Sequence, residues 1–468
     1  MSLGSLLKGL GLIGIFPALV LAATRPDVGE AGNLPPQYSA KTRIACAPAY
    51  LLMPHNDQTT PPMLLSQTGA FEKLNPLTPA AGLIPYDVNL PFWSDASHKV
   101  RWIALPESGH DGRGGESKNS KIKFSEEAPW EFPDGTVFVK HFEFPAGASG
   151  EAPCRIETRL LVRDDSGGVY GATYRWRVDG SDADLINDGV TDVVTTGPKA
   201  QPYAWYFPGR SDCRVCHTPQ EKGVLGVNTR QLNRSGALAG NNQLLTWNAL
   251  GLFDRNLHTE DVSQMPRLRA PDDESASLEV RARSYLDVNC AMCHQPGGVT
   301  GNFDARFSTP LARQNLVDGH VRINLGLDHA RVIAPHDPWR SIALSRLSTL
   351  EKGIMMPPLA HEHLDKAGVN LLKRWIVSMP GDDVLSPPRI TPGGGSSDCP
   401  VSVSLEHEDS HAVIHYTTDG TPPTTASAVY KSTLLTTHPV TIRASAWQQG
   451  KKPSIIVQQT YVITKAQN

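Results

Sequence analysis

The stretch RSYLDVNCAMCHQPGG, residues 283–298, places Cys290, Cys293 and His294 at positions i, i+3 and i+4 of one predicted helix. Apolar residues at helical spacing lead into it from Leu278, and a Pro-Gly-Gly sequence ends it. Side chains three and four positions apart are neighbours on a helix surface. The two thiols and the imidazole are therefore expected to share one helical face.

The stretch DCRVCH, residues 212–217, repeats this spacing with Cys213, Cys216 and His217. Cys-x-x-Cys-His is the spacing of c-type haem attachment. The two thiols form thioethers with the haem vinyl groups, and the imidazole of the next residue binds the iron. The two units predict two covalently bound haem c groups, with His217 and His294 as iron ligands.

Three other uses of paired cysteines fit the sequence less well. Pairs in structural zinc sites lie about 15 to 20 residues apart, whereas Cys216 and Cys290 are separated by 74 positions. A thioredoxin-like pair requires a βαβ context, which neither unit has. Structural disulfides leave unexplained why a histidine directly follows each second cysteine.

Downstream of the second unit, the stretch GIMMPPLAHEHLDKAGVNLLKRWIVSMPG, residues 353–381, predicts an amphipathic helix capped by Asp365. Met356 precedes two prolines, which stiffen the loop and remove backbone donors near the iron. We expect Met356 to be the sixth ligand of the second haem, with Met355 as the alternative. Methionine and histidine ligation raises the reduction potential and suits single-electron transfer.

The first unit has no second axial ligand nearby in the sequence. No other histidine and no methionine lies between it and residue 257. The sixth ligand of the first iron is therefore left open. The candidates are His258 and Met265 downstream, His98 and His141 in the N-terminal region, or a five-coordinate iron that binds a small molecule.

Several longer stretches resemble the exported dihaem c-type cytochromes that carry a chitobiase-like C-terminal module. The resemblance covers most of the mature chain and rests on LIPYDVNLPFWSDASHKVRWIALP (83–106), RIETRLLV (155–162), DCRVCHTP with VLGVNTRQLNR (212–234), RARSYLDVNCAMCHQPGG (281–298) and MMPPLA (355–360). It implies haem binding and electron transfer and carries over no enzymatic reaction. The residues it assigns to covalent haem and iron are Cys213, Cys216, His217, Cys290, Cys293, His294 and Met356.

Composition and the N-terminus indicate where the chain works. The net charge of -3 and pI of 6.6 give no basic field for nucleic acid or anionic lipid. Residues 1–23 combine Lys8, an apolar run and a small-residue end, which predicts a signal peptide cleaved near Ala22/Ala23. We expect an exported, periplasmic chain with no transmembrane span after cleavage, and a retained N-terminal anchor is the alternative.

The flanking regions predict β-structure. Residues 84 to about 200 contain runs of β-branched and aromatic residues between turns, which predict a β-sandwich-like domain, and Cys46 could pair with Cys154. The last 70 residues resemble the immunoglobulin-like module at the C-terminus of chitobiase and β-hexosaminidase. That module suggests polysaccharide contact, and Cys399 is an odd thiol.

The predicted fold is multidomain α+β, with a central, mainly α cytochrome c region between β-domains. The expected boundaries are 1–23 for the signal peptide, 24–202 for the β-rich domain, 203–270 for the first haem segment, 271–381 for a class I cytochrome c-like domain, 382–398 for a linker and 399–468 for the C-terminal β-sandwich. The expected function is electron transfer between periplasmic donor and acceptor proteins. The alternatives are a haem enzyme with a reactive first haem, and a surface-binding protein with structural haems.

Overall fold

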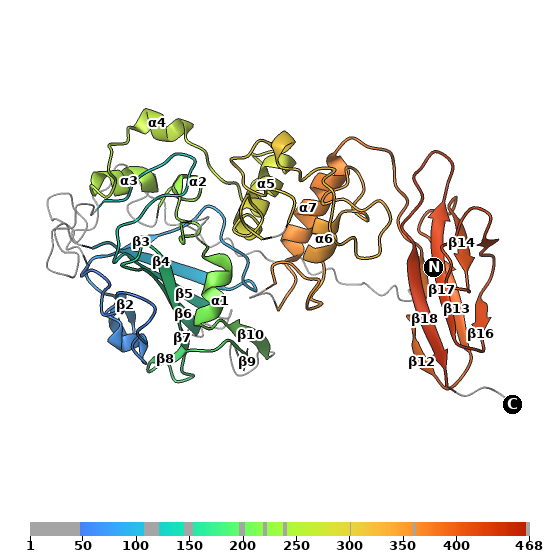
Figure 1. The fold of residues 1–468 in the computed structure, drawn as a ribbon, viewed down its shortest axis with the longest axis horizontal. Helices are drawn as coiled ribbons and strands as arrows, with labels where there is room; N and C mark the ends of the chain where they lie inside the picture. Colours follow the sequence, from blue (N-terminus) through green and yellow to red (C-terminus); the bar gives the residue numbers. More distant parts are fainter. Residues whose placement is uncertain are drawn as a thin grey trace, which may run out of the picture.

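The computed structural model describes most of the chain after residue 46. The described residues are 47–106, 121–144, 153–195, 202–218, 222–236, 241–299, 301–358 and 362–464. The predicted signal peptide, its cleavage site at Ala22/Ala23 and Cys46 lie outside them. In the part that is described, the fold is mostly β with few helices and ends in a β-domain (Figure 1). None of the described helices is both long and apolar enough to cross a bilayer.

The N-terminal region is built on one antiparallel sheet whose six strands follow the chain order. The strands are β3 (Leu83–Tyr86), β4 (His98–Ala104), β5 (Val137–Phe144), β6 (Cys154–Arg163), β7 (Val169–Trp176) and β8 (Ala183–Ile186). β5 is buried at six of its eight positions, so both of its faces need a cover. A β-sandwich would supply that cover as a second sheet, and the structure differs from the predicted sandwich on this point.

Loops, short helices and a small hairpin cover the two faces of the sheet, and no second large sheet of the described residues packs on it. On one face, Val139, Leu160 and Tyr174 pack against the chain around Tyr50 and Leu65. This face also carries the 3-10 helix η2 (Leu65–Gln67) and the hairpin of β1 (Phe71–Leu74) and β2 (Leu77–Pro79). The cover therefore comes from residues that precede the sheet in the sequence.

The opposite face of the sheet is covered by residues between β4 and β5 and by residues that follow the sheet. Ile103 and Phe138 share a core with Trp130, Trp247 and Phe253. Here the short helices α2 (Thr229–Leu232), α3 (Gln243–Ala249) and α4 (Thr259–Gln264) lie over the sheet (Figure 1). The segment predicted to carry the first haem is therefore packed onto the N-terminal sheet and shares its core.

The central region contains three α-helices joined by long irregular stretches. They are α5 (Leu278–Asn289), α6 (Ile342–Leu347) and α7 (Lys366–Ser378), with the 3-10 helix η4 (Leu311–Arg313) between the first two. Asp365 caps α7 by accepting a hydrogen bond from the amide of Gly368 at 2.9 Å. A Cβ at position 368 would overlap the ring of Tyr285, so this glycine lets α5 and α7 pack closely. The two predicted helices are present, but the region is less helical than the expected mainly α domain.

The C-terminal region has two sheets that enclose a separate apolar core. One sheet contains β11 (Arg389–Thr391), β13 (Val401–Glu406) and β16 (Leu434–Thr436), and the other contains β12 (Gly395–Ser397), β18 (Val457–Ile463), β17 (Val440–Trp447), β14 (Val413–Thr417) and β15 (Ala428–Val429). The core includes Val403, Ile442 and Tyr461. The sequence 382–398, predicted as a linker, contributes β11 and β12, because its polar residues pair at sheet edges.

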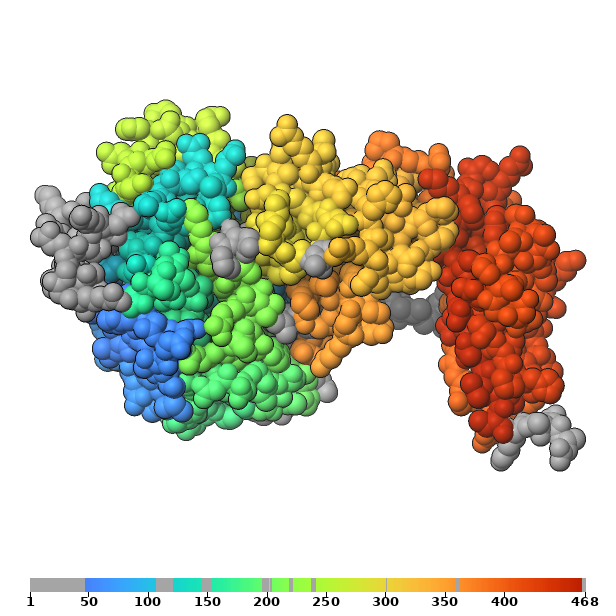
Figure 2. Space-filling view, in the orientation of Figure 1, coloured from blue at the N-terminus to red at the C-terminus, as the bar shows by residue number. Residues whose placement is uncertain are grey.

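The C-terminal β-domain stands beside the rest of the molecule and contacts the central region (Figure 2). The guanidinium of Arg340 donates hydrogen bonds to the carbonyl oxygens of Pro453 at 3.3 Å and Ser454 at 3.4 Å. The amide of Leu385 donates to the carbonyl oxygen of Lys452. These polar contacts join the domain to the chain around Arg340.

Candidate functional site

The first Cys-x-x-Cys-His unit follows a strand and lies directly on the N-terminal sheet. β10 (Tyr203–Phe207), which pairs with β9 (Val190–Val194), leads into the seven-residue helix α1 (Arg210–Cys216). The carboxylate of Asp212 fixes the start of α1, since it accepts hydrogen bonds from the Gly209 amide at 2.9 Å and the Tyr206 hydroxyl at 2.6 Å. The strand and the cap therefore set the direction of the helix that carries the cysteines.

A glycine of the sheet makes room for the first cysteine. Gly171 of β7 lies beneath α1, and a Cβ at this position would overlap the Sγ of Cys213. Burial raises the pKa of the Cys213 thiol, because the thiolate would lose its hydration. The absence of a side chain at position 171 lets α1 approach the sheet closely.

His217 is held with one ring nitrogen satisfied. Its Nδ1 lies 2.8 Å from the carbonyl oxygen of Gly223, so Nδ1–H donates and Nε2 keeps its lone pair. Burial lowers the pKa of His217 to about 4, which keeps the imidazole neutral at physiological pH. A backbone carbonyl on one nitrogen and a free lone pair on the other is the arrangement of a metal-ligating histidine.

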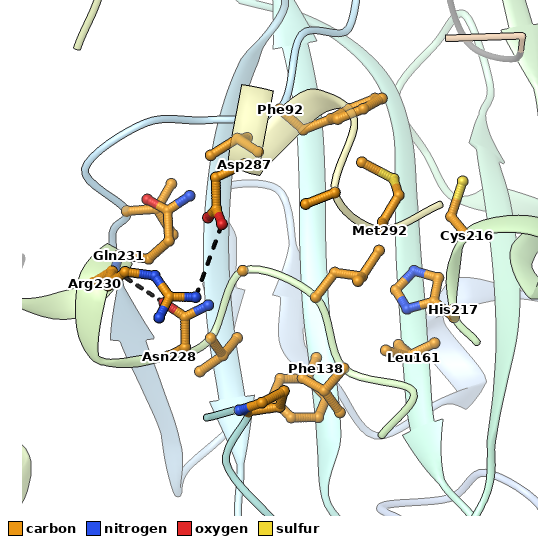
Figure 3. A pocket seen from close by; sticks show the side chains of 18 of the residues that line it. Phe92, Phe138, Leu161, Cys216, His217, Asn228, Arg230, Gln231, Asp287 and Met292 are labelled. Atoms are coloured by element: carbon orange, nitrogen blue, oxygen red, sulfur yellow. Dashed lines mark hydrogen bonds and ion pairs between the residues drawn. The ribbon is translucent and has the colours of Figure 1, made fainter. Parts of the chain in front are cut away.

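The first unit opens onto a cavity of about 680 Å³ between the sheet and the end of α5. Cys213, Cys216 and His217 line one side, and the α5 end of the second unit supplies Met292. Figure 3 shows Met292 on the same side of the cavity as Cys216 and His217. The volume lies within the range of about 300–1,000 Å³ that is usual for cofactor sites.

The floor of the cavity is a face of the sheet with two different rows of side chains. Phe138 and Leu161 are directly opposite each other on β5 and β6 and form an apolar row. Two residues further along the strands, a basic row crosses β4, β5 and β6. It consists of Arg101, Lys140 and Arg159. The cavity thus has an apolar part beside a basic part.

An ion pair crosses from the N-terminal region to α5 at the cavity wall. The guanidinium of Arg230 in α2 lies 3.9 Å from the carboxylate of Asp287 in α5, and both side chains line the cavity (Figure 3). Burial raises the pKa of Asp287 despite this partner. The pair links two regions that the sequence analysis assigned to different domains.

The second unit lies at the C-terminal end of α5, where the predicted helix ends. Cys290 is its C-terminal cap residue and packs partly against the core of the central region. The ring of His294 stacks on Phe303 with centroids 4.4 Å apart and an interplanar angle of 15°. Its buried Nδ1 has no hydrogen-bond partner among the described residues. A Cβ at position 301 would overlap this nitrogen, so Gly301 keeps the space beside the imidazole free.

The two units contact each other, although their sequences are 74 positions apart. The Sγ of Cys293 lies 3.8 Å from the carbonyl oxygen of Val215, which is inside the first unit. A hydrogen bond joins the thiols of Cys216 and Cys293, and it lowers the pKa of Cys293 while it raises that of Cys216. Sequence reasoning treated the two units as separate sites and missed this contact.

Met356 and His294 are both close to Arg346 of α6. The Met356 amide donates to the Arg346 carbonyl oxygen at 3.0 Å. The positive charge of Arg346 helps to lower the pKa of His294, after the larger effect of burial. Met355 is 8% exposed, whereas Met356 is half-buried. The expected ligand loop therefore lies in the neighbourhood of the second unit.

The other ligand candidates for the first iron do not line the cavity. His258 caps α4, and Met265 is buried in the core of the N-terminal region. His141 Nδ1 lies 2.8 Å from Thr158 Oγ1, and His98 pairs with Glu143 at 3.0 Å. Met292 does line the cavity, but the sequence analysis named no residue of the second unit as a candidate for the first iron. The feature visible in the sequence was a methionine between the two cysteines of the second unit.

The remaining cysteines, Cys46, Cys154 and Cys399, lie outside the two units. Cys46 lies outside the described residues, so its pairing with Cys154 stays a prediction, and the Cys154 thiol donates to the Thr195 carbonyl oxygen at 3.3 Å. Cys399 is exposed. Within the described ranges, no three His, Cys, Asp or Glu side chains cluster in a way that would hold a metal ion. A haem iron does not need such a cluster, because the porphyrin supplies four of its ligands.

Comparison with known families identifies the C-terminal region. Residues 392–458 match the chitobiase/beta-hexosaminidase C-terminal domain family. This part of the chain is therefore similar to that domain, and the match agrees with the predicted module. No curated protein matches the chain. The resemblance of the remaining regions to dihaem cytochromes stays a prediction.

Proposed function

We propose that this chain is a dihaem c-type cytochrome that carries single electrons between redox partners. One haem is attached to Cys213 and Cys216, and the other to Cys290 and Cys293. His217 and His294 are the proximal iron ligands. Haem supplies the one-electron chemistry when it is bound.

The observation that carries this proposal is the convergence of the two units beside one cavity. The thiols of Cys216 and Cys293 are hydrogen-bonded to each other. Attachment at these two thiols would bring both porphyrin edges together, which favours electron exchange between them. Structural zinc or disulfide chemistry does not explain a cofactor-sized cavity beside a neutral histidine.

The residues present fit a covalent haem at the first unit. Gly171 leaves room for Cys213, and the carbonyl oxygen of Gly223 orients His217. Met292 lines the same cavity, and its thioether would be the second protein ligand of the first iron. A sulfur ligand would close the coordination position that a peroxidase needs, so this assignment favours electron transfer over an enzymatic role.

The second unit offers the same ligand types from different elements. His294 would supply the proximal nitrogen and Met356 the sulfur, with Met355 as the alternative. The stacked ring of Phe303 restrains the imidazole, and Arg346 restrains the Met356 backbone. Two histidine and methionine pairs would give both irons potentials in the upper range of c-type haems.

The proposed working place is the periplasm. Covalent haem attachment needs export, which the predicted signal peptide of residues 1–23 provides. The electron donor and acceptor are then exported redox proteins. The C-terminal β-domain is proposed to contact polysaccharide, because the family that it matches belongs to enzymes of that chemistry.

Intact mass, a haem stain after denaturing electrophoresis and a redox titration of the exported chain test the proposal. We expect a mass above that of the polypeptide by two haems and two one-electron waves. Material from the same maturation-competent host that carries no covalent haem would overturn the proposal. A high-spin spectrum that shifts with cyanide or peroxide would instead favour the enzyme with a reactive first haem.

A further inference from the structure

Three basic side chains lie in register on adjacent strands of the N-terminal sheet. Arg101 of β4 is directly opposite Lys140 of β5, and Lys140 is directly opposite Arg159 of β6. All three line the cavity of the first unit. Like charges directly opposite each other on a sheet are destabilising. A row of this kind is stable when an anion lies on it.

The chain itself neutralises this basic row incompletely. Arg159 donates to the carboxylate of Glu157 at 2.9 Å, and Arg101 lies 3.8 Å from the carboxylate of Asp87. No carboxylate of the described stretches lies within ion-pair distance of the Lys140 nitrogen. Burial and the neighbouring cations lower the pKa of Lys140 well below its ordinary value. The Lys140 nitrogen lies 4.8 Å from the centroid of the Phe142 ring, and the carboxylate of Glu157 attracts it from beyond ion-pair distance. The centre of the row therefore has no direct carboxylate partner among the described residues.

The basic row lies beside an apolar row on the same face. Ile103, Phe138 and Leu161 are opposite one another on β4, β5 and β6, and Gly171 continues the row on β7 beneath Cys213. Two residues along a strand separate the rows by about 7 Å. The face thus matches a flat amphiphile that is apolar on one side and anionic at one edge.

We propose that Arg101, Lys140 and Arg159 bind the propionate carboxylates of the first haem. The inference rests on the proposed function. A haem has an apolar macrocycle and two carboxylates at one edge, and the two rows offer a surface for each part. Charge-assisted hydrogen bonds from arginine and lysine to carboxylates are strong when they are shielded from water. The N-terminal sheet is then a part of the haem site.

The row also lies within electrostatic reach of the proposed iron ligand. Lys140, Arg159 and His217 line the same cavity. Positive charge near an iron favours its reduced state, because reduction adds a negative charge. Removal of one cation of the row should therefore lower the midpoint potential of the first haem.

Lys140→Met in the full-length, haem-loaded chain tests this assignment. We expect one of the two redox waves to shift to lower potential and the propionate bending band in the resonance Raman spectrum to move. Lys140→Arg should keep both signals near those of the wild type. Lys73→Met is the matched control, since Lys73 is exposed on β1 of the same region. Arg101→Gln provides a second variant if Lys140→Met fails to fold.

The outcomes separate this inference from the proposed function. Absence of covalent haem in the wild type contradicts the proposed function itself. Two covalent haems with unchanged waves and an unchanged propionate band in both variants overturn the inference alone. A further arm adds acetate to the wild type. If acetate shifts the first wave and Lys140→Met abolishes that shift, the row binds a free anion and the propionate assignment is wrong.

Discussion

The two Cys-x-x-Cys-His units have the same five-residue spacing but very different supports. The first lies on a seven-residue helix that packs against β7. The second ends a twelve-residue helix that packs against α7. The core around the second unit comes mainly from α5, α6 and α7, whereas the cavity of the first unit is lined by strands of the N-terminal sheet together with α2 and the end of α5. A motif can therefore show what a site binds without showing what encloses it.

Loss of the attachment thiols should have the largest effect and should separate the two units. Cys213→Ser with Cys216→Ser, and Cys290→Ser with Cys293→Ser, should each reduce the bound haem from two to one per chain, measured by intact mass. We expect the first double variant to lose more thermal stability, because its cavity is left empty between two regions. Equal melting temperatures of the two double variants would contradict the conclusion that the two units are supported differently.

The glycines beside each unit offer a second test. Gly171→Ala should push α1 from the sheet and impair the first attachment, whereas Gly301→Ala should displace the imidazole of His294 and disturb the second haem. Overpacking of this kind costs about 1–3 kcal/mol. Gly393→Ala is the control, because nothing lies within 4 Å of its Cβ. Spectra and urea unfolding would show whether each change stays local to its unit.

The proposed axial methionines should change spectra without removing haem. Met356→Ala should abolish the sulfur-to-iron absorption of the second haem and lower its midpoint potential, because sulfur ligation raises the potential. Met292→Ala should do the same to the first haem. If Met292→Ala leaves both waves and both absorption bands intact, the first iron has another sixth ligand. Met355→Ala checks whether Met355 replaces Met356 as the ligand of the second iron.

The smallest expected effect concerns the acid stability of the sheet that supports the first unit. The imidazoles of His141, 3.6 Å away, and His98, 3.0 Å away, lower the pKa of Glu143 to about 2. A lowered pKa in the folded state stabilises the fold above pH 4.5, and this contribution is lost as the pH falls from 4.5 toward 2. Glu143→Gln should reduce the unfolding free energy on the order of 1 kcal/mol at pH 7. Urea unfolding near pH 2 should show no such difference.

Sequence patterns predicted the parts of the fold that depend on neighbouring residues. The helix that leads to Cys290, the helix capped by Asp365 and the C-terminal β-domain are all present. The predicted N-terminal sandwich was wrong, because alternating and continuous apolar strands do not specify whether a sheet or a set of loops and short helices covers them. The segment 382–398, predicted as a linker, contains the edge strands β11 and β12, since polar segments can pair at sheet edges.

The sequence by itself determined the two thiol and imidazole units, because their spacing along one helical turn is a local property. Only the tertiary structure decided that Cys216 meets Cys293, that Met292 reaches the cavity of the first unit and that Arg101, Lys140 and Arg159 form one row. Arg101 and Met292 line the same cavity although they are 191 positions apart in the sequence. Strand register and packing bring them together, and neither is encoded in the periodicity of a single segment.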